Sequence, residues 1–125
     1  MEAADDPATT NWGGGWRTPT WDEFMELAEN CTSVWINAED GTCGRRFTSK
    51  INGKSIFLTA CGSRGGTELS GYHSYGCYWS SKIYTGGFSF YGMEFIFNSS
   101  TVYTENSDCT NSRYVGCTIR PVITK

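Results

Sequence analysis

The chain has 125 residues, a formal net charge of −3 and no run of lysine or arginine, so we expect one domain without the basic surface that binds nucleic acid. No stretch approaches ~20 apolar residues, which excludes a membrane-inserted helix in this segment. The acidic N-terminus lacks the apolar part of a signal peptide, so an export signal would lie upstream or have been removed. Abundant rings (15% aromatic residues) and 15 glycines favour short strands and many turns.

The clearest local signal is a helix over about residues 20–30. The first 16 residues, rich in glycine, are expected to form an irregular lead-in. Thr20 and Glu23 then have the spacing of N-cap and N3 in a capping box. Apolar residues follow at i, i+3 and i+4, so one face of this helix should pack against the domain; they are Phe24, Leu27 and Ala28.

Beyond the helix the apolar period changes to two, which predicts several short antiparallel strands. Asp40-Gly41 and Asn52-Gly53 are turn signals between the first three strands. The apolar segment 55–59 is expected at the centre of its sheet, and glycine-rich residues 60–76 are expected to be a loop. The predicted strands are 33–37, 44–50, 55–59, 77–81, 88–97 and 114–123, with a polar loop over 104–112. This pattern predicts an α+β fold that is mostly β.

Six cysteines would suit a set of disulfides, although the unknown redox compartment leaves open whether any forms. Cys109 and Cys117 flank one loop and are the first choice for a pair. Because there is no CxxC motif and only one histidine, His73, we expect no metal and no cofactor. Residues 105–108 are the one local alternative, as a weak calcium-binding candidate.

Several segments, in order, resemble the signature of a known family. They are Trp12-Gly13 with Trp16-Arg17-Thr18-Pro19-Thr20 (a WGxxWRxPT pattern), residues 52–58, Gly62-Ser63-Arg64, Tyr78-Trp79-Ser80-Ser81, and residues 113–122. Their order and spacing resemble the Fibrobacter succinogenes major paralogous domain family, found on secreted and surface proteins of Bacteroidetes-type bacteria and their phages. The resemblance implies the formylglycine-generating-enzyme-like variant of the C-type lectin fold, in one domain over 1–125.

The chain departs from that family in places. Thr59 stands where members usually have proline, and Cys61 stands where they usually have a small residue. Members generally carry further strands before the WGxxWR segment, so this domain is expected to lack some N-terminal strands of the family.

Some members look like variable proteins of diversity-generating retroelements, in which adenine-templated errors randomise Asn-type codons. Between Thr104 and Cys117 only Glu105 lies outside the residues reachable in this way. Because polar loops are rich in the same residues, such an origin stays an open alternative.

The best functional signal is the aromatic and polar mixture of the C-terminal half, which is typical of adaptable binding surfaces. The candidate ligand-binding residues are Tyr84, Phe88, Phe90, Tyr91, Ile96, Tyr103, Asn106, Asp108, Asn111 and Tyr114. Because alternate residues of a strand face inward, about half of the rings should be core; Trp79, Phe95 and Phe97 are assigned to it. The tryptophan-rich corner around Arg17 is interpreted as scaffold, not as a ligand platform.

These observations predict a non-enzymatic binding module, secreted, displayed on a cell surface or carried on a phage particle. Its partner would be a protein or glycan on a cell surface, and its oligomeric state is not predicted. The alternative is a structural or adhesive subunit of a surface protein. Catalysis finds little support because His73 is the only histidine and lies in a glycine-rich loop.

Overall fold

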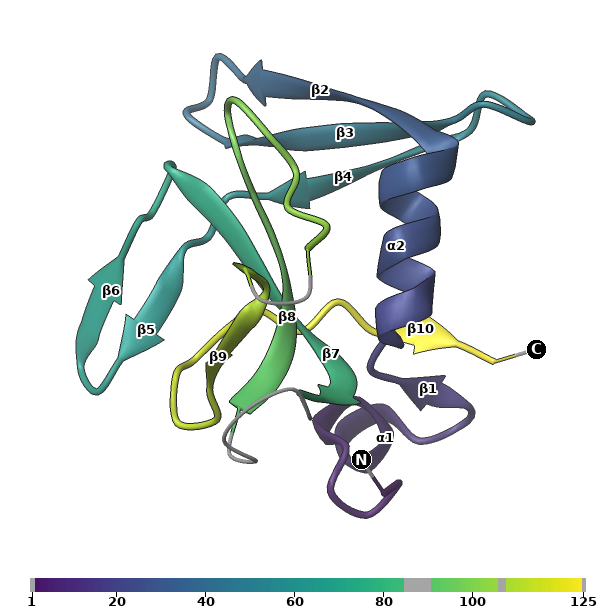
Figure 1. The fold of residues 1–125 in the computed structure, drawn as a ribbon, viewed down its shortest axis with the longest axis vertical. Coiled ribbons are helices and arrows are strands. Elements are labelled where there is room, and N and C mark those ends of the chain that lie inside the picture. Colours follow the sequence, from purple (N-terminus) through teal and green to yellow (C-terminus); the bar gives the residue numbers. More distant parts are fainter. Residues whose placement is uncertain (1, 85–90, 106–107, 125) are drawn as a thin grey trace.

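The computed structural model describes residues 2–84, 91–105 and 108–124 (Figure 1). Over these ranges the chain is α+β and mostly β, with two helices and four small antiparallel sheets. The helices are α1 (Pro7–Trp12) and α2 (Trp21–Asn30). The strands are β1 (Trp16–Arg17), β2 (Cys31–Asn37), β3 (Cys43–Ser49), β4 (Ser55–Thr59), β5 (Ser63–Gly65), β6 (Glu68–Ser70), β7 (Tyr75–Ile83), β8 (Tyr91–Asn98), β9 (Thr110–Ser112) and β10 (Val122–Ile123).

Helix α2 confirms the prediction from the capping box. The Thr20 hydroxyl accepts a hydrogen bond from the Glu23 amide, and the Glu23 carboxylate accepts one from the Thr20 amide. Phe24 is buried, with Leu27 and Ala28 packed beside it against the core. Neither helix in the described ranges is long and apolar enough to cross a membrane.

The sheet β2–β3–β4 follows directly from α2, and the two turns lie where the sequence predicts them. At the first turn the Asp40 carboxylate accepts a hydrogen bond from the Thr42 amide. The strand order corrects one expectation, because β3 is the central strand and residues 55–59 form the edge strand β4. The central strand carries buried Arg45 and Phe47, whereas the apolar β4 leaves Ile56 partly exposed. The apolar composition of residues 55–59 therefore did not identify the central strand of the sheet.

A ring-rich core lies where α2 crosses the strands. Phe24 stacks on Phe95 with ring centroids 4.8 Å apart, and Phe97 meets Phe47 edge-on at 6.0 Å. Phe95 and Phe97 are fully buried, as predicted for alternate residues of β8. Gly76 on β7 is required there, because a Cβ at this position would overlap the Phe97 ring.

Residues 60–76, expected to be a loop, contain the hairpin β5–β6 before β7 begins. The hairpin projects from the body of the domain in Figure 1. Gly66 has φ of +60°, so it supplies the left-handed backbone that the short connection needs. The polar and glycine-rich composition, which suggested a loop, is that of a small exposed hairpin.

The two ends of the chain meet through the pairing of β1 with β10. The N-terminal lead-in is partly helical, because Asp6 caps α1 and Pro7 begins it. The predicted closing strand 114–123 is wrong as one continuous strand. Gly116 bridges to Arg64, and Thr118 bridges to Tyr78, before the short β10 is reached. The segment therefore pairs briefly with β5, then with β7 and finally with β1, and does not form one long strand.

Candidate functional site

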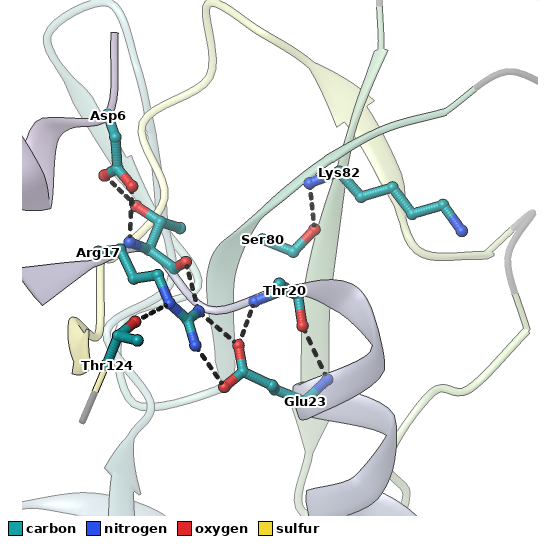
Figure 2. Close-up of polar contacts among 8 residues, drawn as sticks. Asp6, Arg17, Thr20, Glu23, Ser80, Lys82 and Thr124 are labelled. Atoms are coloured by element: carbon teal, nitrogen blue, oxygen red, sulfur yellow. Dashed lines mark hydrogen bonds and ion pairs between the residues drawn. The ribbon is translucent and has the colours of Figure 1, made fainter. Parts of the chain in front are cut away.

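The tryptophan-rich corner is held together by charged hydrogen bonds (Figure 2). The Arg17 guanidinium donates to both oxygens of Glu23, at 2.6 and 3.0 Å, and its Nε donates to the Thr124 hydroxyl at 2.7 Å. The hydrogen bond from Arg17 is the largest cause that lowers the pKa of Glu23 to about 2. These contacts join β1, α2 and the C-terminal segment, so Arg17 has the scaffold role that the sequence predicts.

Asp6 forms a second set of hydrogen bonds in the same corner. Its carboxylate accepts hydrogen bonds from the amide and hydroxyl of Thr18, at 2.9 and 2.7 Å, and from the Ala8 amide. Burial would raise the pKa of Asp6, but these hydrogen bonds outweigh burial and hold the pKa below its ordinary value of 3.8. The Asp6 carboxylate therefore has a structural role: it connects the start of α1 to Thr18.

Aromatic, acidic, amide and sulfur side chains gather on one face of β8, which we call the Glu94 face. Alternate residues of a strand point to the same side, so Gly92, Glu94, Ile96 and Asn98 share this face and the core residues take the other. The registers with β7 and β9 add Tyr75, Cys77, Trp79 and Asn111. A groove lies at one end of this face, a buried carboxyl at its centre and a smaller hollow at the other end.

The groove at the Gly92 end has a volume of about 370 Å³. The Trp79 ring lies against Gly92, so closely that a Cβ on residue 92 would stand 2.7 Å from Trp79 Cζ3. The indole N–H donates to the Val115 carbonyl, which fixes the ring orientation. Apolar surface dominates the lining. Among the described residues its charged members are two cations and one carboxylate; the described lining is Asp5, Pro7, Trp79, Ser80, Ser81, Lys82, Ile83, Gly92, Arg113 and Ile119.

The centre of the face holds Glu94 against the Cys77–Cys117 disulfide. Its Oε2 lies 2.8 Å from Cys77 Sγ and 3.2 Å from Cys117 Sγ, and it accepts a hydrogen bond from Asn111 Nδ2 at 3.3 Å. A disulfide sulfur carries no hydrogen, so the two sulfur contacts are not hydrogen bonds in the oxidised protein. Burial raises the pKa of Glu94, and the Asn111 hydrogen bond partly offsets this.

The hollow at the Asn98 end has a volume of about 210 Å³ and brings three predicted ligand-binding residues together. Ile96, Tyr103 and Asp108 line it with Tyr75, Phe97 and Asn98. Tyr103 is partly buried and its hydroxyl accepts a hydrogen bond from Asn98 Nδ2 at 3.4 Å. Asp108 is exposed at the rim.

The other predicted ligand-binding residues are dispersed. Tyr114 is 84% exposed in the turn after β9, and Tyr91 is exposed at the start of β8. Tyr84 is half-buried against the cluster of Trp21, Met93 and Cys109. Asn111 points to Glu94. Phe88, Phe90 and Asn106 lie outside the described residues, as does part of the calcium candidate at 105–108.

Two expectations at this site are corrected. Cys117 pairs with Cys77 on β7, so the predicted Cys109–Cys117 pair is wrong. Cys109 is a buried free thiol that donates to the Tyr103 carbonyl, and burial is the largest cause that raises its pKa to about 12. Trp79, assigned to the core, is only partly buried and lines the groove. His73 is exposed and stacks on Tyr72.

Sequence reasoning missed the residues that complete the face. Gly92 was not singled out, although a glycine inside an alternating strand signals a close approach of another group. Glu94 is an acidic residue between Met93 and Phe95 in an apolar strand, and this position also indicates a buried polar group. Lys82, Ile83 and Ile119 carry no local signal of this kind.

Comparisons of the chain with protein-family models, curated proteins and solved structures found no match in any of the three.

Proposed function

We propose that the chain is a ligand-binding module of the C-type-lectin-like kind, which binds a glycan or protein on a cell surface through its Glu94 face. The observation that carries this proposal is the groove in which the Trp79 ring lies over Gly92. A half-buried indole, fixed by its hydrogen bond to Val115, offers a rigid apolar surface at little entropic cost to the complex.

The lining of the groove favours a ligand that combines an apolar or ring face with an acidic group. Pro7, Ile83 and Ile119 extend the apolar surface beside Trp79. Lys82 and Arg113 give the lining two positive charges against the one negative charge of Asp5, although the whole chain carries −3. Local positive charge in an acidic protein attracts anionic ligands selectively. Acidic glycans and acidic peptide segments both have this chemistry.

An exposed ring extends the contact area beyond the groove. Tyr114 follows the groove residue Arg113 in sequence and is 84% exposed, whereas Tyr91, next to Gly92 on β8, lies on the opposite face of that strand. Tyrosines on the rim of a pocket supply wide amphipathic contact. We assign Tyr114 to the ligand surface, together with the hollow lined by Ile96, Tyr103 and Asp108.

The Cys77–Cys117 disulfide supports an extracellular or surface location, because such bonds persist mainly in oxidising compartments. Diversification of this surface by a retroelement would extend the proposed function. Sequences of sibling gene copies test it: changes confined to Asn-type codons over 82–117 support diversification, and uniform variation contradicts it.

An array of glycans and surface proteins tests the function. We expect one ligand class to bind the protein and to lose most of its signal with Trp79→Ala. The matched control is Trp12→Ala, which removes an indole that is 58% exposed on α1 and does not line the groove. Equal loss in both variants, or no binding on either array, would contradict the proposal.

A structural or adhesive subunit is the second candidate, and one observation favours it. Val34 is 62% exposed on β2, and the side of that sheet away from the core also carries Ile36 and Phe57. A partner chain could cover this apolar face. Under this alternative Val34→Asp would abolish a stable assembly of the purified protein, measured by light scattering, and the array would stay silent.

A further inference from the structure

The centre of the Glu94 face gathers three groups that bind metals, from positions far apart in sequence. Cys77 Sγ, Cys117 Sγ and a carboxylate oxygen of Glu94 all lie within 4.8 Å of one another. Cys77 and Glu94 are buried, and Cys117 is partly buried. Two thiolates and one carboxylate are a ligand set that zinc accepts.

In the disulfide form the buried Glu94 carboxyl has few hydrogen-bond donors. The Glu94 side chain belongs to a residue that is only 4% exposed, and its Oε2 is aimed at both sulfurs. In the disulfide form neither sulfur can donate, so Asn111 Nδ2 is the one side-chain donor to this carboxyl in the described part of the chain. A buried carboxylate with so few partners is costly, and a cation between it and two thiolates would remove that cost.

From this arrangement we infer that, once the disulfide is reduced, Cys77, Glu94 and Cys117 form a binding site for a zinc-like divalent cation. Reduction by an external thiol gives two protein thiols and one disulfide of the reductant. Both protein thiols then lose a proton to solvent as the cation binds. In a tetrahedral zinc site the sulfurs stand about 3.8 Å apart, a separation that fits within the spacing of these donors.

Access and a fourth ligand come from the side of Cys117. Cys117 lines a shallow hollow of about 300 Å³ beside β5, together with Cys61, Arg64 and Gly116. Water in this hollow can complete the coordination. Cys61 does not belong to the group of donor atoms that lie within 4.8 Å of one another, so it is not a ligand of this site. Asn111 is a positioning residue, which orients the Glu94 carboxylate through its hydrogen bond.

Cobalt titration of the reduced protein tests the site, because a thiolate bound to Co²⁺ gives a charge-transfer absorption that oxygen ligands do not give. The protein should carry Cys31→Ala, Cys43→Ala and Cys61→Ala, so that the other non-buried thiols do not contribute. We expect one equivalent of Co²⁺ with thiolate absorption, displaced by Zn²⁺. The oxidised protein should show none.

Substitutions at the ligands separate this site from adventitious thiol binding. Glu94→Gln should weaken Co²⁺ binding about a hundredfold, and Asn111→Ala about tenfold, with circular dichroism unchanged. Zn²⁺ should raise the melting temperature of the reduced protein and leave that of the Cys77→Ser/Cys117→Ser variant unchanged. Absence of thiolate absorption in the reduced, folded protein would overturn the inference. Equal affinity for Co²⁺ in the Glu94→Gln variant would also overturn it.

Discussion

Arg17 and Glu23 form a bidentate ion pair that connects the β1–β10 pairing to the first turn of α2. The same carboxylate accepts the Thr20 amide hydrogen bond of the capping box, so one side chain closes the helix end and anchors the arginine. Arg17 in turn reaches Thr124 beside β10. The two ends of the chain are therefore coupled through Glu23.

We predict that Glu23→Gln lowers the free energy of unfolding by about 1 kcal/mol at neutral pH. The pair is partly exposed, with side-chain exposures of 33% and 39%, so solvent screening keeps the loss small. Glu26→Gln is the matched control, because Glu26 is exposed on the same helix. Urea unfolding of the two variants measures the difference, and equal stability would contradict the role of the pair.

The same contact gives a pH dependence with a defined sign. The pKa of Glu23 is about 2 in the folded protein, against an ordinary value of 4.5. The contribution is therefore fully present above about pH 4.5 and is lost as the pH falls towards 2. Unfolding measured across this window should show the difference between wild type and Glu23→Gln vanish at the acid end. A difference that stays constant with pH would contradict the assignment.

Arg45 is predicted to be a structural arginine that lysine cannot replace. It is 8% exposed, and its guanidinium donates to the Asn98 and Ser99 carbonyls and to the Ser33 hydroxyl. Arg45→Lys loses the planar arrangement of donors, so we expect a loss of about 2 kcal/mol in the free energy of unfolding. Arg46→Lys, on the exposed side of the same strand, should change it little. Similar losses in both variants would refute this role.

The structure and the sequence predict different partners for Cys117, and peptide mapping can distinguish them. Peptide mapping without reduction should recover Cys77 linked to Cys117, whereas recovery of a Cys109–Cys117 link would contradict the structure. The bond closes a loop over a sequence separation of 40, so loss of both cysteines should cost about 3 to 4 kcal/mol of stability in the chain-entropy account. Urea unfolding of Cys77→Ala/Cys117→Ala measures the cost.

Local signals accounted for α2 and for the strands and turns of the first sheet, although not for which of its strands is central. The capping box at Thr20 and the turn residues Asp40-Gly41 and Asn52-Gly53 act over a few positions, so the sequence contains all that they need. The failures are contacts across long separations. Residues 114–123 alternate as a strand would, yet Gly116 and Thr118 find different neighbours, which only the assembled domain supplies.

The candidate site shows the same division. The sequence singled out Ile96, Tyr103 and Asp108, which the structure places around one hollow. It did not identify the groove, because Trp79 and Gly92 meet across two strands and the remaining walls come from distant segments. An amphipathic ring such as tryptophan suits both core and surface, so residue type alone could not assign Trp79.

Binding to the groove is tested most directly by isothermal titration of the best array ligand into Gly92→Ala and Gly65→Ala. A methyl group at residue 92 would stand 2.7 Å from Trp79 and displace the ring, whereas one at residue 65 meets nothing within 4 Å. We predict that Gly92→Ala raises the dissociation constant at least about tenfold, a loss of roughly 1.4 kcal/mol, and that Gly65→Ala leaves it unchanged. Equal affinities for folded Gly92→Ala and wild-type protein would contradict the account.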